Sequence, residues 1–316
     1  MTENTHVVGV LVDPTEKAEW VEELNRQVAA SDLPLRIDTE ADPAEVDYMV
    51  YNIDSGMFDF TPYTKLRAIL NTWAGVEGAL KTLNWPDHVP FCRMVEPGMT
   101  IGMVEYFLAH TMRYHMDTDR SVTQSAEGRW QKYMPPLAAD RGVGILGLGA
   151  LGTAIAERMA ANGFQVHGWA RSAKDIPGVT THHGAEGLQE CLSQAEILCI
   201  ILPLTSETEK ILNAETLARL PGGACIINAG RGPLIDDDAL LEALANRHIR
   251  HATLDVFREE PLPADHPYWK HPNVTVTPHI AAFTRTKSAT SAILEQIRCD
   301  LHGFALQHVV DRARGY

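Results

Sequence analysis

Short apolar runs alternate along the chain with segments in which apolar residues recur at helical spacing. This alternation is typical of parallel β-sheets covered by helices, because a strand that is buried on both faces is apolar throughout. The alternation continues from one end of the chain to the other, so the pattern predicts an α/β fold. The apolar runs fall into two series, which predict two domains, each with a doubly wound parallel sheet.

The first series predicts a smaller domain. Its runs include HVVGVLVD, VDYMVYN, LRAILNT and VPFCRMV, and an amphipathic stretch at residues 16–29 follows the first of them. The second series predicts a six-stranded domain. Its runs are VGILGLG, FQVHGW, EILCIILP, ACIINAG, HATLDVF and NVTVTP, and each is followed by a helix-like or loop segment.

The chain between the two series predicts the domain boundary. Pro97 and Gly98 break the chain there, and an apolar helix is expected from about Ile101, which makes the break a candidate hinge. After Thr277 the segment at residues 286–308 has helical spacing, and no further strand follows. We expect this segment to pack on the first domain, so that residues 1–98 and 287–316 form one discontinuous domain and residues 99–286 form the other.

Composition and charge narrow the classes of function. The 316 residues are 45% hydrophobic and carry 27 basic against 41 acidic side chains, which gives a formal net charge of −14. This charge repels phosphate backbones and anionic membrane surfaces, so neither nucleic acid nor a membrane is an expected partner. An anionic ligand must instead be bound by local arginine side chains and backbone N–H groups.

Cysteine usage and the search for targeting signals predict the cellular compartment of the protein. The five cysteines are scattered and mostly lie in apolar runs, as expected of buried thiols in a reducing compartment. The apolar run at residues 7–12 is too short for a signal peptide, and no run approaches the roughly 20 residues of a membrane span. We therefore expect a cytoplasmic protein.

A glycine motif follows the first strand of the second series. It reads Gly147-Leu148-Gly149-Ala150-Leu151-Gly152. The motif lies between an apolar strand and a helix-favouring segment, the context in which such glycines bind a dinucleotide. Gly147 permits a tight turn, Gly149 lets a pyrophosphate approach the backbone, and Gly152 lets helix and strand pack closely. The helix N-terminus then faces the phosphates with unsatisfied N–H groups. The alternative is a glycine-rich turn that binds no ligand.

The end of the second strand indicates which dinucleotide is bound. A carboxylate at this place would bind the ribose hydroxyls of NAD and repel a 2′-phosphate, but the chain carries Arg171, Ser172 and Lys174 instead. Arg171 can pair with a 2′-phosphate bidentately, with Ser172 as a further donor and Lys174 as a second positive charge. We expect NADPH as the preferred cofactor. NADH is the alternative, if Arg171 is only a solvated loop residue.

Three polar side chains stand just past apolar strands, where doubly wound folds bind their ligands. Arg231 follows CIINAG, Glu260 follows ATLDVFRE and His279 follows VTVTP. Their chemistry suits the reduction of a 2-oxo acid. His279 would protonate the alkoxide that hydride transfer leaves, and Glu260 would raise the pKa of His279. Arg231 would polarise the carbonyl oxygen and pair with the carboxylate. The alternatives are a surface ion pair and a hydrogen-bonded loop histidine, and no metal is required.

Other polar clusters receive a structural interpretation. Asp236, Asp237 and Asp238 precede a helical segment and are expected to cap it rather than to bind a metal. His182 and His183 are expected in a polar loop. We therefore predict no metal site.

Four motifs together resemble the D-isomer-specific 2-hydroxyacid dehydrogenases: GLGALG, NAGRGPLID, LDVFREEPLP and TPHIAA. Four further segments resemble the glyoxylate/hydroxypyruvate reductase A branch of that family: EPGMTIGMVEY, WARSAKDIPGV, HPYWKHPNVTVTPHIAAFTR and VDRARGY. The resemblance implies a flavodoxin-like substrate-binding domain and a Rossmann cofactor domain. It also implies reduction of glyoxylate and hydroxypyruvate with NADPH, with Arg231, Glu260 and His279 as the catalytic residues.

The resemblance implies roles for further residues. In the family, the loop after the fourth strand of the small domain binds the substrate carboxylate. Here that loop is Trp73-Ala74-Gly75-Val76, and Trp73 departs from the branch's usual pattern. By the same resemblance, Asp255 would face the nicotinamide amide, and Leu202, Pro203 and Ala229 would line the cofactor groove.

Partners and alternative functions follow from the same family. A homodimer is implied, and the apolar helix at residues 101–116 is a candidate interface, although packing on its own domain would explain its composition equally well. The alternatives in function are a relative that acts on another 2-oxo or 2-hydroxy acid with NAD, a formate or phosphite dehydrogenase, and a non-catalytic dinucleotide sensor of the co-repressor type. The formate branch generally has glutamine where Glu260 stands.

Overall fold

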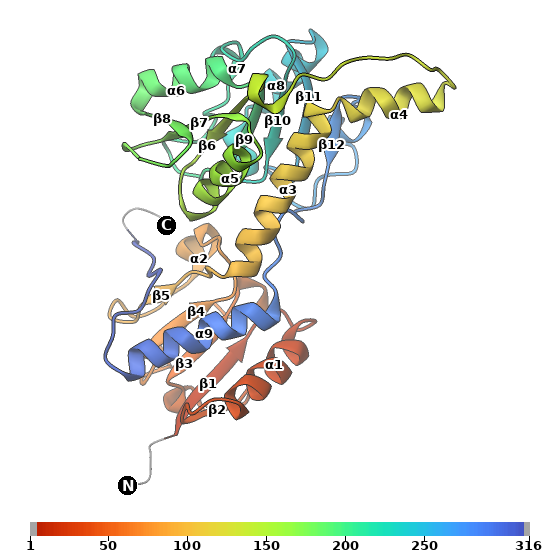
Figure 1. Cartoon of the computed structure of the whole chain (residues 1–316). Helices are drawn as coiled ribbons and strands as arrows, with labels where there is room; N and C mark the ends of the chain where they lie inside the picture. The colour runs from red at the N-terminus through yellow and green to blue at the C-terminus, as the bar shows by residue number, and fades with distance from the viewer. Residues whose placement is uncertain (1–4, 313–316) are drawn as a thin grey trace. The chain divides into compact units, whose positions relative to one another are not determined.

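The computed structural model describes residues 5–312, apart from the side chain of Glu77. The chain forms two compact units. Unit 1 comprises the residues up to Met99 together with those from Thr284 onward, and unit 2 is Thr100–Phe283. Figure 1 labels the elements of both. Each unit has its own parallel sheet, which confirms the predicted α/β fold.

Unit 1 contains a five-stranded parallel sheet in the order β2-β1-β3-β4-β5. This is the flavodoxin-like order, in which the chain winds to both sides of the first strand. Its strands are β1 (His6–Leu11), β2 (Leu35–Ile37), β3 (Tyr48–Tyr51), β4 (Ala68–Asn71) and β5 (Phe91–Cys92). All residues of β3 and β4 are buried, which explains why these runs are apolar without alternation.

Helices cover the sheet of unit 1. They are α1 (Lys17–Ala29), α2 (Glu77–Thr82) and α9 (Thr286–Leu301), with short 3-10 turns η1 (Pro43–Glu45) and η2 (Ile53–Ser55). The helices α1 and α9 lie side by side (Figure 1), although more than two hundred residues separate them in sequence. Gln27 Nε2 donates to the carbonyl of Lys287 at 2.8 Å, and Ser291 Oγ donates to Gln27 Oε1 at 2.9 Å. The C-terminal helix therefore completes the first unit.

The prediction for the C-terminal helix was too long. A helix was expected over residues 286–308, but α9 ends at Leu301. Gly303 takes a left-handed φ of +75°, a conformation that other residues adopt with strain, and its N–H donates to the carbonyl of Asp300. The apolar residues beyond Gly303 therefore cannot belong to the same helix.

The chain enters unit 2 through helix α3 (Pro97–His115). A break had been expected at Pro97 and Gly98, with the helix starting at about Ile101, but the helix begins at Pro97 itself. Proline fits the first helical position because its missing N–H has no partner to lose there. Met103, Phe107 and Tyr114 of this helix are buried in the core of unit 2, so much of its apolar surface packs on its own unit.

Unit 2 contains a seven-stranded parallel sheet in the order β12-β11-β10-β9-β6-β7-β8. Its middle is the Rossmann order, with the direction of winding reversed between β6 and β9. The strands are β6 (Gly142–Leu146), β7 (Gln165–Ala170), β8 (Val179–His183), β9 (Ile197–Ile200), β10 (Ala224–Asn228), β11 (Ile249–Leu254) and β12 (Val274–Val276).

Two predictions about this sheet were wrong. Six strands were expected and seven are present, because the segment at 179–183 forms the edge strand β8. His182 and His183 end this strand and do not lie in a loop. Only one neighbour pairs with an edge strand, and no residue of β8 is fully buried, so polar side chains are tolerated along it. The apolar pattern that indicated the other strands is therefore missing.

Helices pack on both faces of the second sheet. Helices α3 and α5 (Ala150–Ala161) belong to one core cluster, and α6 (Gly184–Gln194), α7 (Ala214–Leu217) and α8 (Asp237–Ala245) belong to the other. The unit also contains α4 (Thr118–Ala126), which extends away from the sheet (Figure 1), and the 3-10 turns η3 (Ala138–Asp140), η4 (Gly232–Leu234) and η5 (Pro267–Lys270). Alternate strand residues face opposite cores: Leu198 belongs to one cluster with α8, and Cys199 belongs to the other with α3 and α5. Among residues 5–312, no helix is long and apolar enough to cross a bilayer.

Candidate active site

Each glycine of the turn after β6 is explained by a different feature of the backbone. Gly147 has φ +108°, and a Cβ there would lie 2.8 Å from the carbonyl oxygen of Ile201. A Cβ on Gly152 would lie 1.7 Å from the carbonyl oxygen of Gly147, so only glycine lets α5 start this close to the strand. Both glycines are required by the turn itself.

Gly149 is different, because a Cβ there would meet no atom of the protein within 4 Å. Gly149 is exposed and is the N-cap of α5. Because glycine has no side chain, no capping oxygen reaches the first N–H groups of this helix. A Cβ at this position would occupy the space where a phosphate would approach those N–H groups. The turn therefore fits the pyrophosphate of a dinucleotide, with Ala150 and Leu151 as the first residues of the helix.

The loop after β7 carries the predicted 2′-phosphate residues. Arg171, Ser172 and Lys174 are all exposed. The guanidinium of Arg171 lies 3.9 Å from the Glu207 carboxylate, and both side chains are mostly in solvent, so this ion pair is weak. The backbone carbonyl of Lys174 accepts a 2.6 Å hydrogen bond from Thr181 Oγ1, which fixes the far end of the loop against β8.

The predicted lining of the cofactor groove lies at two strand ends. Leu202 and Pro203 follow β9, and Ala229 follows β10. Leu202 and Ala229 are buried, whereas Pro203 is exposed. These strands lie on the side of β6 where the winding of the sheet reverses, which is where doubly wound sheets bind ligands.

Two glycines fix the place of Arg231. Gly230 packs on the β9 loop, since a Cβ there would lie 2.9 Å from the carbonyl oxygen of Leu202. Gly232 packs on the backbone of Phe257, where a Cβ would lie 2.0 Å from the carbonyl carbon. Arg231 therefore stands between the loop that carries the groove residues and the loop that leads to Glu260.

Glu260 and His279 form a direct pair. His279 Nδ1 lies 2.7 Å from Glu260 Oε2, and Glu260 Oε1 accepts a 2.8 Å hydrogen bond from the N–H of Phe257. Because an ionised carboxylate only accepts hydrogen bonds, Nδ1 carries the shared hydrogen and Nε2 is the nitrogen left to act elsewhere. The His279 side chain is 57% exposed, so a substrate can reach it.

The electrostatics of the pair favour a protonated imidazole. The hydrogen bond to Glu260 raises the pKa of His279 above its ordinary value, against an opposing contribution from burial, and the negative charge of Asp255 adds to the rise. Burial alone would raise the pKa of Glu260, but the hydrogen bonds from His279 and Phe257 hold that pKa below its usual range. Arg231 is close enough to lower the pKa of both groups.

Asp255 lies beneath this pair. It follows β11, is 1% exposed, and its carboxylate accepts hydrogen bonds from Thr277, Ile280 and Ala281. Sequence reasoning placed Asp255 beside the nicotinamide amide, and that role stays a prediction. The structure gives the carboxylate a second task, since it holds the chain on either side of His279.

The predicted substrate-binding loop lies in unit 1, between β4 and α2. Trp73 is 37% exposed and therefore is not an ordinary core residue, whereas Val76 is buried. Asn71 Nδ2 donates to the carbonyl of Trp73 at 2.8 Å and to that of Gly75 at 3.3 Å, and so braces the loop. Binding of a carboxylate by Ala74, Gly75 and Val76 stays a prediction.

Sequence reasoning missed the side chains that brace these loops. Asn228, buried at the end of β10, donates to the carbonyl of Arg231 at 3.0 Å and accepts from the N–H of Gly230 at 3.0 Å. Asn71 has the equivalent place at the end of β4. A signal was available, since an asparagine at the end of an apolar strand can hydrogen-bond the backbone of the turn that follows.

The remaining polar clusters have structural partners. Asp236 caps α8 by accepting from the N–H of Ala239, as predicted. His182 pairs with Glu190 at 3.0 Å and lies 3.3 Å from His167. Within residues 5–312, no group of three or more His, Cys, Asp or Glu side chains has a metal-binding arrangement.

A phosphate-binding turn and a carboxylate–imidazole pair, both at the carboxyl ends of one Rossmann sheet, define the class of nicotinamide-dependent oxidoreductases. Residues 106–281 match the model of the D-isomer specific 2-hydroxyacid dehydrogenase NAD-binding domain. The chain is 39% identical over 259 residues to glyoxylate/hydroxypyruvate reductase A of Serratia proteamaculans. The aligned region covers 80% of this chain and 82% of that protein.

Solved structures agree with the family match. A D-isomer specific 2-hydroxyacid dehydrogenase from Xanthobacter autotrophicus, in complex with NADPH and MES, superposes with a TM-score of 0.90 at 37% identity over 99% of this chain and 100% of that one. An NADPH-dependent glyoxylate/hydroxypyruvate reductase from Sinorhizobium meliloti, in complex with NADP and sulfate, superposes with a TM-score of 0.86 at 33% identity. This match covers 98% of this chain and 100% of that one. The chain belongs to the D-isomer specific 2-hydroxyacid dehydrogenase family.

Proposed function

We propose that this protein is an NADPH-dependent reductase of small 2-oxo acids, which converts glyoxylate to glycolate and hydroxypyruvate to D-glycerate. The observation that carries the proposal is the 2.7 Å contact between His279 Nδ1 and Glu260, which leaves Nε2 to deliver a proton at an exposed position. The similar reductases of Serratia proteamaculans and Sinorhizobium meliloti support the choice of substrates.

The proposed reaction needs one proton from the protein. A nicotinamide cofactor, held by the glycine turn and the groove residues, would supply a hydride to the carbonyl carbon, and the electron pair of the C=O bond would move to oxygen. His279 Nε2 gives its proton to this oxygen, which completes the 2-hydroxy acid. Glu260 stabilises the imidazolium before the transfer, and Arg231 stabilises the charge that develops on oxygen.

The substrate must also be oriented. We propose that Arg231 pairs with the substrate carboxylate through its planar fork of N–H donors. The resemblance adds the backbone N–H groups of Ala74, Gly75 and Val76 as a second carboxylate-binding element. In that arrangement Trp73 would select for small substrates, because its ring would occupy the space that a longer side chain needs.

The cofactor preference is proposed from the loop after β7. Arg171, Ser172 and Lys174 together offer two positive charges and a hydroxyl donor where a NAD-binding chain would carry a carboxylate. The glycine turn and the start of α5 would hold the pyrophosphate, and the loops at Leu202, Pro203 and Ala229 would line the groove. The solved relatives in complex with NADPH and NADP support this assignment.

The alternatives differ in one measurable property each. A relative specific for another 2-oxo acid would turn over slowly with glyoxylate, and an NAD enzyme would prefer NADH. A formate or phosphite dehydrogenase would reduce NAD with those anions. A non-catalytic sensor would bind the dinucleotide without turnover. The presence of Arg231, Glu260 and His279 at neighbouring strand ends favours catalysis over sensing.

A substrate panel tests the proposal. NADPH oxidation is followed with glyoxylate, hydroxypyruvate, pyruvate and 2-oxobutyrate, with NADH in parallel, for the native protein and for Arg171→Ala. We expect the highest kcat/KM with glyoxylate or hydroxypyruvate and NADPH, and a rise of about tenfold in the KM for NADPH in the variant. No turnover with any oxo acid would refute the proposal.

We further propose that the protein is a homodimer in the reducing cytoplasm. All five cysteines are free thiols, and four of them are buried.

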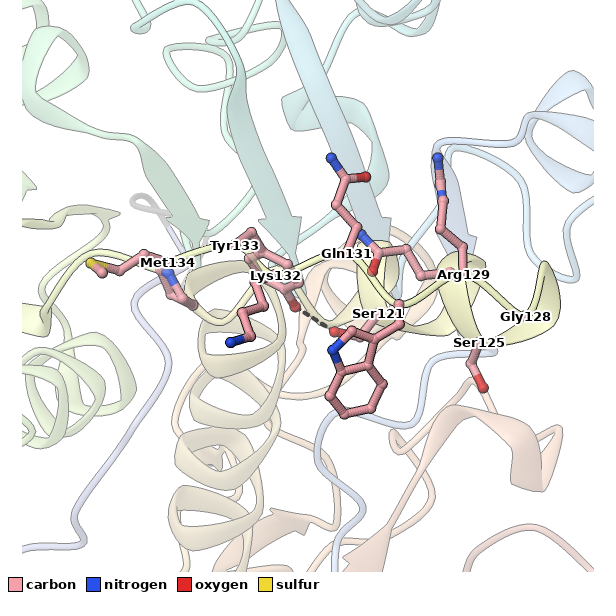
Figure 2. Close-up of a pocket in the computed structure, with 11 residues that line it drawn as sticks. Ser121, Ser125, Gly128, Arg129, Gln131, Lys132, Tyr133 and Met134 are labelled. Atoms are coloured by element: carbon pink, nitrogen blue, oxygen red, sulfur yellow. Dashed lines mark hydrogen bonds between the residues drawn. The ribbon is translucent and has the colours of Figure 1, made fainter.

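Helix α4 and the extended segment after it form a groove, in which Tyr133 is hydrogen-bonded to Ser121 (Figure 2). Val122, Trp130 and Met134 expose 64%, 92% and 93% of their surface there. Such an apolar surface fits a second copy of the chain.

A further inference from the structure

A network of hydrogen bonds behind His279 has no place in the reaction described so far. The N–H groups of three consecutive residues end on Asp255: that of His279 on its backbone carbonyl, and those of Ile280 and Ala281 on its two carboxylate oxygens, each at 2.9 Å. Asp255 is itself buried at the end of β11. The backbone around His279 is therefore held by one residue, and two of the three hydrogen bonds end on its carboxylate.

The backbone of His279 needs this support. Its φ is +54°, in the left-handed region that non-glycine residues rarely adopt. Such a conformation persists only where the surroundings hold it, and here those surroundings are the three N–H groups on Asp255. The direction of the imidazole therefore depends on the position of the Asp255 carboxylate.

The carboxylate of Asp255 is held in turn by Thr277. Thr277 Oγ1 donates to Asp255 Oδ1 at 2.5 Å, and Thr277 follows β12 directly. The same hydroxyl oxygen lies 2.8 Å from the hydroxyl of Tyr106, on helix α3. A threonine hydroxyl has one hydrogen, and this hydrogen is used by Asp255 because an ionised carboxylate cannot donate. Tyr106 must therefore be the donor to Thr277.

The chain of donors has a fixed direction, from Tyr106 to Thr277 to Asp255. The Tyr106 ring is held by its neighbours on α3: its centroid lies 5.9 Å from that of Phe107 and 4.6 Å from that of His110. Burial raises the pKa of Tyr106, so its hydroxyl keeps its hydrogen and remains a donor across the working pH range. Helix α3 thus contributes a polar anchor to a loop at the opposite end of the unit's sequence.

We propose that Tyr106 and Thr277 are positioning residues for His279, which act on it through the Asp255 carboxylate. The proposal rests on the proposed function, since it assigns these residues to the orientation of the proton donor. Neither side chain touches the imidazole, so their effect should appear in the geometry and pKa of His279 rather than in cofactor binding.

Conservative variants test the two positions. Thr277→Val removes the donor to Asp255 with little change of shape, and Tyr106→Phe removes only the hydroxyl. We expect kcat to fall about fivefold or more in each variant, the loss expected for a hydrogen bond of average strength, while the KM for NADPH stays unchanged. Thr277→Ser keeps the hydroxyl and should restore most of the activity.

The chain offers a matched control on the same helix. Tyr114 of α3 is also bonded to a threonine hydroxyl, that of Thr253 in β11, at 2.5 Å, and both residues are buried. This second pair is not part of the hydrogen bonds to Asp255. Tyr114→Phe should lower the melting temperature at least as much as Tyr106→Phe, but it should leave kcat and the pH profile unchanged.

A double variant tests whether Tyr106 acts through Thr277. If it does, adding Tyr106→Phe to Thr277→Val produces no further loss of kcat, because the acceptor of the tyrosine is already gone. Independent roles would instead multiply the two losses. The multiplied result would overturn the proposed order of the chain.

Histidine NMR separates this proposal from the proposed function. The imidazole of His279 is titrated in the protein without substrate, and its signal is assigned by comparison with His279→Asn. We expect the pKa of His279 to fall in Thr277→Val and Tyr106→Phe, because a looser loop weakens the bond to Glu260, and to stay put in Tyr114→Phe. An unchanged pKa in the first two variants would overturn the inference even if no oxo acid is reduced. If no oxo acid is reduced but the pKa of His279 changes as expected, only the proposed function is overturned.

Discussion

At the scale of single residues, the central feature of the site is the contact between Glu260 and His279. The two side chains are nineteen positions apart in sequence, and each follows a strand of the same parallel sheet. The carboxyl ends of neighbouring parallel strands meet at one edge, so β11 and β12 bring the two loops together. The pair favours protonation of His279, because the negative carboxylate stabilises the charged imidazolium more than the neutral ring.

Replacing Glu260 by glutamine should move the pH profile of reduction. A general acid works while it is protonated, so activity is lost as pH rises through the pKa of His279. The carboxylate raises that pKa, and its loss should shift the alkaline side of the kcat/KM profile to lower pH. The profile is measured with glyoxylate and NADPH between pH 5 and pH 9 in both proteins. If the profile keeps its position while activity drops, Glu260 does not set this pKa.

The strand-end positions of the proposed catalytic side chains could be predicted from sequence, whereas their supports could not. Arg231, Glu260 and His279 stand just past apolar runs, so strand order alone places them at one edge. Asn228 ends a strand and Thr277 follows one, but nothing in the pattern tells whether such a side chain turns toward the loop backbone or toward solvent. That choice depends on side-chain direction, which is set only by the packed fold.

The elements of the fold followed from periodicity wherever burial was complete. Strands β6, β9 and β10 are buried at every position and read as continuous apolar runs. Strand β8 does not read as an apolar run, because its positions are only partly buried. The three-residue strand β2 is too short to show a period of two. Edge position and short length, rather than unusual chemistry, hid these two strands.

Glycines decide where elements meet, and the sequence predicted separate roles for the three glycines of GLGALG. Gly147 and Gly152 are required by contacts inside the turn, whereas Gly149 leaves open space in front of a helix N-terminus. Gly230 and Gly232 hold Arg231 between two loops, a role that the motif NAGRG did not reveal. The spacing in GLGALG indicates which glycine leaves room for a ligand, but only the packed backbone shows what the glycines on either side of Arg231 contact.

The whole molecule consists of two units that share one chain, and the last helix belongs to the first unit. The net charge of −14 gives no long-range attraction for an anionic cofactor or substrate. Binding must therefore come from local groups: the N-terminus of α5, the guanidinium of Arg171 and that of Arg231. We expect the affinity for NADPH to rest on the first two groups and the affinity for the substrate to rest on Arg231.

The proposed homodimer is tested by molecular mass in solution. Trp130→Glu and Met134→Glu place charges on the exposed apolar segment, which should prevent a second copy from covering it. Light scattering after size-exclusion chromatography should show a dimer for the native protein and a monomer for the double variant. Phe304→Glu, at a side chain 69% exposed in unit 1, serves as the control and should remain dimeric. A native monomer at micromolar concentration would contradict the proposal.

The most direct test of the account is the comparison of turnover with cofactor binding in His279→Asn. Asparagine can keep a hydrogen bond to Glu260 but cannot supply an acidic proton to the substrate oxygen. NADPH oxidation with glyoxylate and NADPH binding by fluorescence are measured on the same protein sample. We predict a fall in kcat by a factor of about 10² to 10⁴ with unchanged affinity for NADPH. Turnover close to that of the native protein would contradict the assignment of His279 as the proton donor.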